Sequence, residues 1–321
     1  MARLIFTLAT LLTGIFAFAA PSQAQQYPDR PVKIVVGFAA GSGPDLQART
    51  VGQQLAIDLG QQFYVENKLG ANGTIAARAV ATAEPDGYTL LFSSSSIAPT
   101  PYIYKNTGYD LLKDLKPIAT VGELDGIFML VNASSPVKTV PEFIAYAKKT
   151  PVAYGSPGVG NELHLKAELF KRMAGIEMQH IPYKGASEVT TALLGGAVQL
   201  MFVTPPSVIG LIQEGRVRPL AFTGSKPFAA FPDVPLMKQY LPDYVQGSWG
   251  MFFAPGKTPD AIVNQLNTAI HAALRKPSVA ATMQRDGYVP DTRDAAETAA
   301  FFRQKVEECN DLVKAAGIQS N

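Results

Sequence analysis

The sequence predicts an α/β protein of two lobes, each a mostly parallel sheet flanked by helices, with two crossover segments joining the lobes. Short β-branched runs alternate with helical patterns along most of the chain, which is typical of parallel sheets covered by helices. The alternation falls into two series, and each series contains a loop of small residues between a strand and a helix. A length of 321 residues also suits two domains of ordinary size.

The first series begins with a β-branched run at 31–38, followed by a helix. Gly43 and Pro44 suit the start of that helix, because proline is favoured at the first helical position, and Gly60 suits its end. The other elements expected here are a strand at 63–66, a helix at 75–83, a turn at 85–87 and a strand at 88–93.

The second series follows two extended runs at 118–121 and 127–131. Its expected helices are 142–149, 162–173, 187–194 and 207–214, and its expected strands are 152–154, 178–181, 198–203 and 217–223. Another strand-like run, 248–253, precedes helices at 260–274 and 294–316. The chain therefore leaves the first lobe near residue 125 and returns near 247. This places 25–125 and 247–321 in lobe 1, and 126–246 in lobe 2.

The first 24 residues have the pattern of a cleaved signal peptide. Arg3 is followed by an apolar run to Ala20, and the small residues Ser22 and Ala24 stand at the −3 and −1 positions of a cleavage site. The alternative, a membrane anchor, is disfavoured because the apolar run is short and contains several threonines. We expect an exported, periplasmic protein that begins near residue 25.

Composition excludes several functional classes. A net charge of +2 leaves no large basic surface for nucleic acid. One cysteine and three histidines are too few for a thiolate cluster and a thin supply for a metal site, so we expect neither metal nor cofactor. The G-x-S-x-G motif of hydrolases does not occur, and Gly256-Lys257-Thr258 is not a phosphate loop because Met251 stands where its first glycine is needed. We therefore expect a protein that is not an enzyme.

Two small-residue loops are the most informative motifs. The first loop is Ala39–Asp45 and the second loop is Gly155–Asn161, and each follows a strand and opens a helix. Helix N-termini present unpaired N–H groups and the positive end of the helix dipole, so they suit a carboxylate or a phosphate. Neither loop contains lysine or arginine. The alternative is that the glycines serve only turn geometry.

The chain resembles the substrate-binding receptors of tripartite tricarboxylate transporters, the TctC or Bug family. The resemblance spans the mature chain and is carried by the segments 27–31, 37–45, 65–73, 85–90, 160–165, 182–185, 194–196 and 231–235. It implies a two-lobed, periplasmic-binding-protein-like fold that closes on a small organic acid. It also implies delivery of that acid to membrane permease subunits, and we expect the receptor to be a monomer.

The resemblance implies a set of ligand-binding residues by position, with ordered water between some of them and the acid. They are Phe38, Ala39, Ala40, Ser42 and Asp45 in lobe 1, and Ser156, Gly160, Asn161 and His164 in lobe 2. Two of these have a structural alternative. Asp45 can be only a favourable charge at the positive end of the helix dipole, instead of a residue that orders the loop and its waters. His164 can be a satisfied, half-buried histidine instead of a donor that faces the cleft.

Further candidates come from other positions. Ser94, in the run Ser93–Ser96, is a candidate hydroxyl donor, and Tyr183 is a candidate cap for the pocket. Each has a structural alternative, a polar turn and a packing tyrosine. Val203 and Thr204 stand where the family commonly has an aspartate, which argues against a cationic ligand and favours one with an apolar, aromatic or acidic far end.

The ligand class follows from these positions. We expect a small carboxylate, with aliphatic or aromatic dicarboxylates of the terephthalate type as candidates. A sensor receptor for the same ligands and a periplasmic enzyme acting on an organic acid are the alternative functions.

Overall fold

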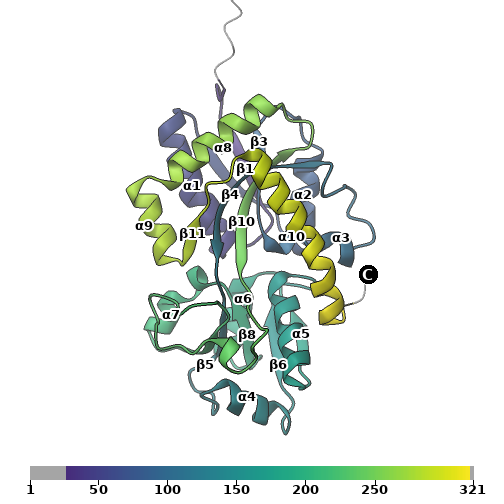
Figure 1. Ribbon diagram of the computed structural model, residues 1–321, viewed down its shortest axis with the longest axis vertical. Helices are drawn as coiled ribbons and strands as arrows, with labels where there is room; N and C mark the ends of the chain where they lie inside the picture. Colours follow the sequence, from purple (N-terminus) through teal and green to yellow (C-terminus); the bar gives the residue numbers. More distant parts are fainter. Residues whose placement is uncertain (1–26, 319–321) are drawn as a thin grey trace, which may run out of the picture.

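The computed structural model describes residues 27–318, which form two lobes stacked along the long axis (Figure 1). The predicted leader, 1–24, lies outside the described residues. Each lobe is a sheet covered by helices, so the prediction of two α/β lobes joined by two crossover segments is confirmed.

Lobe 1 contains the six-stranded sheet, in the order β11-β4-β10-β3-β1-β2. Its elements are β1 (Val32–Val36), α1 (Gly43–Leu59), β2 (Phe63–Asn67), η1 (Ala71–Gly73), α2 (Thr74–Ala81), β3 (Thr89–Ser94), η2 (Ser95–Ile97), α3 (Thr100–Ile103), β4 (Leu115–Leu124), β10 (Ser248–Pro255), α8 (Asp260–Leu274), α9 (Pro277–Arg285), β11 (Tyr288–Pro290) and α10 (Ala295–Ala316).

Lobe 2 contains the five-stranded sheet, in the order β7-β6-β8-β5-β9. Its elements are β5 (Phe128–Asn132), α4 (Val140–Ala147), β6 (Ala153–Ser156), α5 (Glu162–Ala174), β7 (Gln179–Pro182), α6 (Ala186–Leu194), β8 (Leu200–Val203), η3 (Pro205–Ser207), α7 (Ile209–Gln213), β9 (Val217–Phe222) and η4 (Met237–Gln239).

Both sheets are mixed, and the reversed strands lie next to the crossovers. In lobe 1, β10 and the short β11 run against the other strands, and in lobe 2 only β5 does. β10 enters lobe 1 from lobe 2 and inserts between β3 and β4, while β5 receives the chain that leaves β4. The remaining strands of each sheet point the same way, so their carboxyl ends, where α1 and α5 begin, face the other lobe.

Apolar side chains pack on both faces of each sheet, which explains why most strands read as continuous hydrophobic runs. A smaller cluster joins the lobes: Ile103 of lobe 1 packs with Leu165 of α5, and with Val313 and Ala316 of α10. α10 itself lies along β4 and continues beside α5, so it contacts both lobes (Figure 1).

The sequence does not predict α3, α9, β11 or the short 3₁₀ helices, and it predicts one helix that is too long. α3 and β11 have only four and three residues, and periodicity is weak over so few. α9 has nine residues, as many as the predicted α6, so its length does not explain why it is missed. The helix expected at 207–214 is helical only over Ile209–Gln213, because the Pro205-Pro206 pair begins a separate 3₁₀ turn. The single tryptophan, Trp249, packs in the core against Phe301 and Phe302.

Candidate functional site

The first loop is held in shape by Asp45, a side chain of the first turn of α1. Asp45 is 1% exposed. Its carboxylate accepts hydrogen bonds from Gly41 N (2.9 Å), Asn67 Nδ2 (2.8 Å) and Arg49 Nε (3.0 Å). Gly41 has φ of +79°, a conformation that glycine adopts without strain. These bonds all lie within lobe 1, so Asp45 orders its loop.

The charge of Asp45 is stabilised where it lies. Burial on its own raises the pKa of this carboxyl, but the hydrogen bonds from Arg49, Asn67 and Gly41 outweigh burial. The pKa of Asp45 therefore lies below its usual range, and the group is an anion at neutral pH. Its contact with a ligand stays a prediction.

The other predicted residues of this region differ in exposure. The Phe38 ring lies against Gly73, and the Phe38 carbonyl accepts a hydrogen bond from Asn67 Nδ2 (2.9 Å). Ala39 is half-buried and Ala40 is exposed. Ser42 is buried, yet its Oγ has no hydrogen-bond partner and does not cap α1. A buried hydroxyl without a partner is uncommon, so Ser42 requires an explanation.

The second loop is held by uncharged groups. Asn161 caps α5, with its Oδ1 accepting from Leu163 N (2.9 Å). The Ser156 hydroxyl, fully buried, donates to Gly158 O (3.0 Å) and lies 2.7 Å from His180 Nε2. Gly160 has φ of +75°, and its N–H donates to His164 Nδ1 (3.0 Å).

His164 and His180 stack on each other inside lobe 2. Their ring centroids are 3.8 Å apart, and Tyr154 continues the stack. Burial lowers the pKa of His164 to about 3 and that of His180 to about 4, with Lys171 adding to both effects and His180 adding to the first. Both rings are neutral at pH 7. Because His164 Nδ1 accepts from the second loop, the structure favours the interpretation of His164 as a satisfied, buried histidine.

Asn72 joins the two lobes at the base of these loops. Its Nδ2 donates to Ser96 O (3.1 Å) in lobe 1 and to Gly160 O (3.2 Å) in lobe 2. Its Oδ1 accepts from Asn161 Nδ2 (2.9 Å), which also donates to Ser96 Oγ (3.1 Å). Asn72 has φ of +52°, a left-handed conformation that asparagine tolerates better than most residues. The second loop is thus joined to Asn72 and Ser96 of lobe 1 by a shared polar network.

Closer to the start of α1, the lobes meet without hydrogen bonds. A Cβ on Gly43 would lie only 2.9 Å from Thr204 Oγ1 of lobe 2 and 3.7 Å from the Tyr288 hydroxyl of β11. α1 also contacts η3, in which the Ser207 Oγ is buried without a partner. Ser42, at the start of α1, and Ser207 of η3 therefore each carry an unpaired buried hydroxyl, on elements of different lobes that contact each other.

The remaining predicted residues, Tyr183, Val203 and Ser94, have contacts of their own. A Cβ on Gly185 would lie 3.0 Å from the Ala39 Cβ, so the loop after Tyr183 faces the first loop. Tyr183 is half-buried and packs with the apolar cluster that contains Val203, whose side chain is fully buried. Ser94 is buried, and its Oγ accepts from Ser96 N (3.3 Å). The structure thus gives Tyr183, Val203 and Ser94 structural contacts, while any ligand contact by them stays a prediction.

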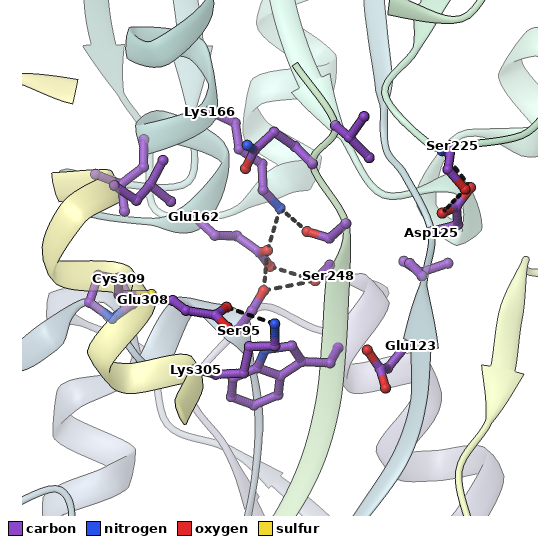
Figure 2. Close-up of a pocket in the computed structure, with 18 of the residues that line it drawn as sticks. Ser95, Glu123, Asp125, Glu162, Lys166, Ser225, Ser248, Lys305, Glu308 and Cys309 are labelled. Carbon is purple, nitrogen blue, oxygen red and sulfur yellow. Dashed lines mark hydrogen bonds and ion pairs between the residues drawn. The ribbon is translucent and has the colours of Figure 1, made fainter. Parts of the chain in front are cut away.

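Two large cavities lie away from these loops. One, of about 670 Å³, lies between α5, α10 and the crossover strands, and includes Glu162, Lys166 and Trp249 (Figure 2). The other, of about 570 Å³, lies between 226–230 of lobe 2 and the end of α9.

Sequence reasoning did not find Asn72, Ser207 or Tyr288 as residues of the lobe interface. The Ala71-Asn72-Gly73 stretch carries a turn signal, but a turn signal does not show which lobe it faces. Tyr288 belongs to a strand that was not predicted. Ser207 follows two prolines and has no motif of its own.

Over residues 27–318, no cluster of three or more metal-ligating side chains occurs. Within that same range, none of the helices is both long and apolar enough to cross a membrane.

The comparisons with known proteins agree on one family. The sequence model described as the tripartite tricarboxylate transporter family receptor matches residues 47–318. A UPF0065 protein from the gbd 5′ region of Cupriavidus necator is 34% identical, with 99% of this chain and 97% of the relative covered. The protein BugT of Bordetella pertussis is 33% identical, with 95% and 96% covered.

Solved structures give the same answer. The periplasmic binding protein BugD superposes with a TM-score of 0.88 at 32% identity, over 92% of this chain and 100% of that one. Rpa4515 of R. palustris with adipate has the same values. MatC of Rhodopseudomonas palustris with bound malate has a TM-score of 0.84 at 30% identity, over 89% and 100%. The predicted periplasmic-binding-protein-like fold is thereby confirmed.

Proposed function

The chain belongs to the tripartite tricarboxylate transporter receptor family, and from this premise we propose that it is a periplasmic receptor that binds a small organic carboxylate between its lobes. In this proposal, α1 and α5 present their N-termini to the acid. The carboxylate is met by backbone N–H groups and hydroxyls, because neither loop carries a basic side chain.

The observation that carries the proposal is the pair of buried hydroxyls without partners, Ser42 and Ser207, at the interface between α1 and η3. Leaving such a group unpaired costs about 1–3 kcal/mol. A ligand that accepts hydrogen bonds from both hydroxyls removes that cost only when the lobes are together. This difference between open and closed states is what drives closure on a ligand.

The ligand class follows from the charges that are present. The Asp45 carboxylate already accepts hydrogen bonds from Arg49 and Asn67. Val203 and Thr204 are uncharged. The interface thus supplies neutral donors, which suit an acid and offer little to an amine. Related receptors are known with adipate and malate, so dicarboxylates are the first candidates, and terephthalate extends the series to aromatic acids.

Delivery to a permease and the absence of turnover complete the proposal. His164 is neutral and paired, and Asp45 is fully hydrogen-bonded, so neither side chain is placed as an acid or base for catalysis. Deleting the gene should abolish uptake of the acid that binds. Normal uptake with loss of a transcriptional response to that acid would support the sensor alternative.

The test is a thermal-shift and titration series with adipate, malate and terephthalate, with the matching diamides as controls. We expect the acids to stabilise the protein and the amides to leave it unchanged. Ser42→Ala should weaken acid binding about tenfold, or ~1.4 kcal/mol. The same change should not lower the free energy of unfolding, because it removes an unpaired buried hydroxyl.

Thr120→Val is the matched control. Thr120 Oγ1 is also buried without a partner, but it lies in β4 of the lobe 1 sheet, between β11 and β10. This variant should leave acid binding unchanged. Equal stabilisation by acids and amides, or unchanged affinity in Ser42→Ala, would contradict the proposal.

A further inference from the structure

We propose that Glu162 and Lys166 of α5 form a buried clamp that docks lobe 2 against lobe 1 and thereby sets the equilibrium between open and closed lobes. The inference rests on the proposed function in one respect, that closing of the lobes is what captures the solute. It concerns residues outside the two small-residue loops, in the wall of the 670 Å³ cavity (Figure 2).

The two charges are paired within α5. Lys166 Nζ lies 2.8 Å from Glu162 Oε2, and the two residues are 3% and 6% exposed. Glutamate and lysine are almost never buried to this degree unless they are paired. Because both belong to one helix, the ion pair moves with lobe 2 as a unit. Its remaining hydrogen bonds decide where that unit docks.

Those remaining bonds all cross to lobe 1 or to the crossover strand. The Ser248 hydroxyl donates to Glu162 Oε1 (3.0 Å), and the Ser95 hydroxyl of η2 donates to Glu162 Oε2. Ser95 and Ser248 also lie 2.9 Å apart, so the two serines form one donor group. Lys166 Nζ donates to Gly247 O (2.5 Å), at the point where the chain returns to lobe 1. Figure 2 shows these side chains converging between α5 and β10.

The contacts around the clamp belong to the same docking surface. Asn161, the residue before Glu162, binds Asn72 and Ser96 of lobe 1. Leu165, the residue before Lys166, packs against Ile103 and α10. The first turns of α5 thus combine a polar and an apolar contact with lobe 1, and the ion pair lies between them.

The physical consequence is a preference for one lobe arrangement. A buried carboxylate needs several donors, and here three come from uncharged serines outside lobe 2: Ser95, Ser248 and, at 3.5 Å, Ser96. When α5 rotates away from η2 and β10, the Glu162 carboxylate loses these serine donors. It stays without them until water enters and replaces them. A buried ion pair adds little stability by itself, but it penalises arrangements that leave a charge unsatisfied. The clamp therefore selects the arrangement in which α5 meets Ser95 and Ser248.

The test uses small-angle scattering and Trp249 fluorescence on the unliganded protein, followed by titration with the acids of the preceding section. Trp249 is the single tryptophan, is adjacent to Ser248 and lines the cavity, so its emission reports the entry of water. Ser95→Ala removes one lobe 1 donor and leaves both charges in place. We expect a larger radius of gyration, a red shift of Trp249 emission and about tenfold weaker acid binding.

Charge variants extend the test. Glu162→Gln leaves Lys166 buried without its counter-ion and should open the lobes further than Ser95→Ala does. The double variant Glu162→Gln/Lys166→Met removes both charges and should recover part of the closed population. If Glu162→Gln does not fold, Ser95→Ala alone decides the outcome.

Lys171→Met is the matched control, because Lys171 pairs with Glu168 on the same helix at 3.2 Å but within lobe 2. It should leave scattering and fluorescence at wild-type values. Wild-type scattering and emission in a folded Ser95→Ala variant would overturn the clamp. The scattering and fluorescence readouts need no ligand, so they remain valid if none of the acids binds, an outcome that would contradict only the proposed function.

Discussion

The first and second loops occupy equivalent places in the two lobes, but different chemistry holds each in shape. In the first loop, a buried anion, Asp45, gathers donors from Gly41, Arg49 and Asn67. In the second loop, neutral groups do the same work, with Ser156 and His164 bonding the backbone of Gly158 and Gly160. In both loops, backbone N–H groups remain at the start of a helix, and the loop itself contains no positive side chain. The two solutions differ in their sensitivity to mutation and to pH.

The largest expected effect is the loss of the anion in the first loop. Asp45→Ala leaves Asn67 and Arg49 without their shared acceptor, and should lower the free energy of unfolding by about 2–3 kcal/mol. Arg49 is partly exposed, which keeps the value below that of a fully buried pair. Urea denaturation measures the change, and acid binding should be lost with it.

The matched control is an exposed ion pair of the same lobe. Lys33 and Glu66 lie 3.6 Å apart at the surface, so Glu66→Ala should cost less than about 1 kcal/mol. Equal losses in the two variants would show that the first loop does not depend on its buried charge.

The second expected effect is a difference between the two loops in how their contributions to stability depend on pH. The pKa of His164 falls to about 3 in the folded protein, against 6.5 for an ordinary histidine. Below pH 6.5, His164 therefore binds a proton in the unfolded chain but stays neutral in the folded protein. The free energy of unfolding declines as the pH falls from there. Asp45 behaves differently: because its pKa lies below the usual ~3.9, its contribution is present above that value and is lost only as the pH falls below it.

Unfolding free energies of the wild type, His164→Gln and Asp45→Asn between pH 3 and 8 test this difference. His164→Gln should flatten the wild-type slope between about pH 6.5 and 4 by up to ~1.4 kcal/mol per pH unit. Asp45→Asn should change the slope only below about pH 4. Parallel curves for the wild type and His164→Gln would show that the buried imidazole does not govern stability.

The smallest expected effect concerns the contact between the lobes. Gly43→Ala places a Cβ 2.9 Å from Thr204 Oγ1, a distance that requires the threonine to move. Lobe 1 alone should tolerate this change, because Gly43 begins a helix. We expect three- to tenfold weaker acid binding, or ~0.7–1.4 kcal/mol, without loss of stability.

Thr204→Ala provides the partner for a double-mutant cycle. If the clash across the lobes is the cause, Gly43→Ala/Thr204→Ala should bind more tightly than the sum of the single variants predicts. Strictly additive effects would place the cost of Gly43→Ala within lobe 1.

Some features of the candidate site can be predicted from the sequence, and others depend on residues far apart in the chain. The small-residue loops, their positions after β1 and β6, and Asn161 before α5 are readable because strand–loop–helix patterns are local. The sequence leaves the role of Asp45 open between two interpretations, because the choice depends on Asn67, which lies 22 residues away on β2. The sequence likewise leaves the role of His164 open, since only the neighbouring strand β7 brings His180 onto its ring.

What the sequence determined by itself is the order of most strands and helices, the two lobes and the two loops, because each depends on side-chain periodicity and on residues close together in the chain. The tertiary structure alone decided which surfaces of the lobes meet. It placed Tyr288 and Thr204 beside Gly43, and it buried Glu162 and Lys166 against Ser95 and Ser248. In sequence, a glutamate and a lysine one turn apart look like any exposed ion pair on a helix. They form a buried clamp only because η2 and β10 of lobe 1 cover them and exclude water.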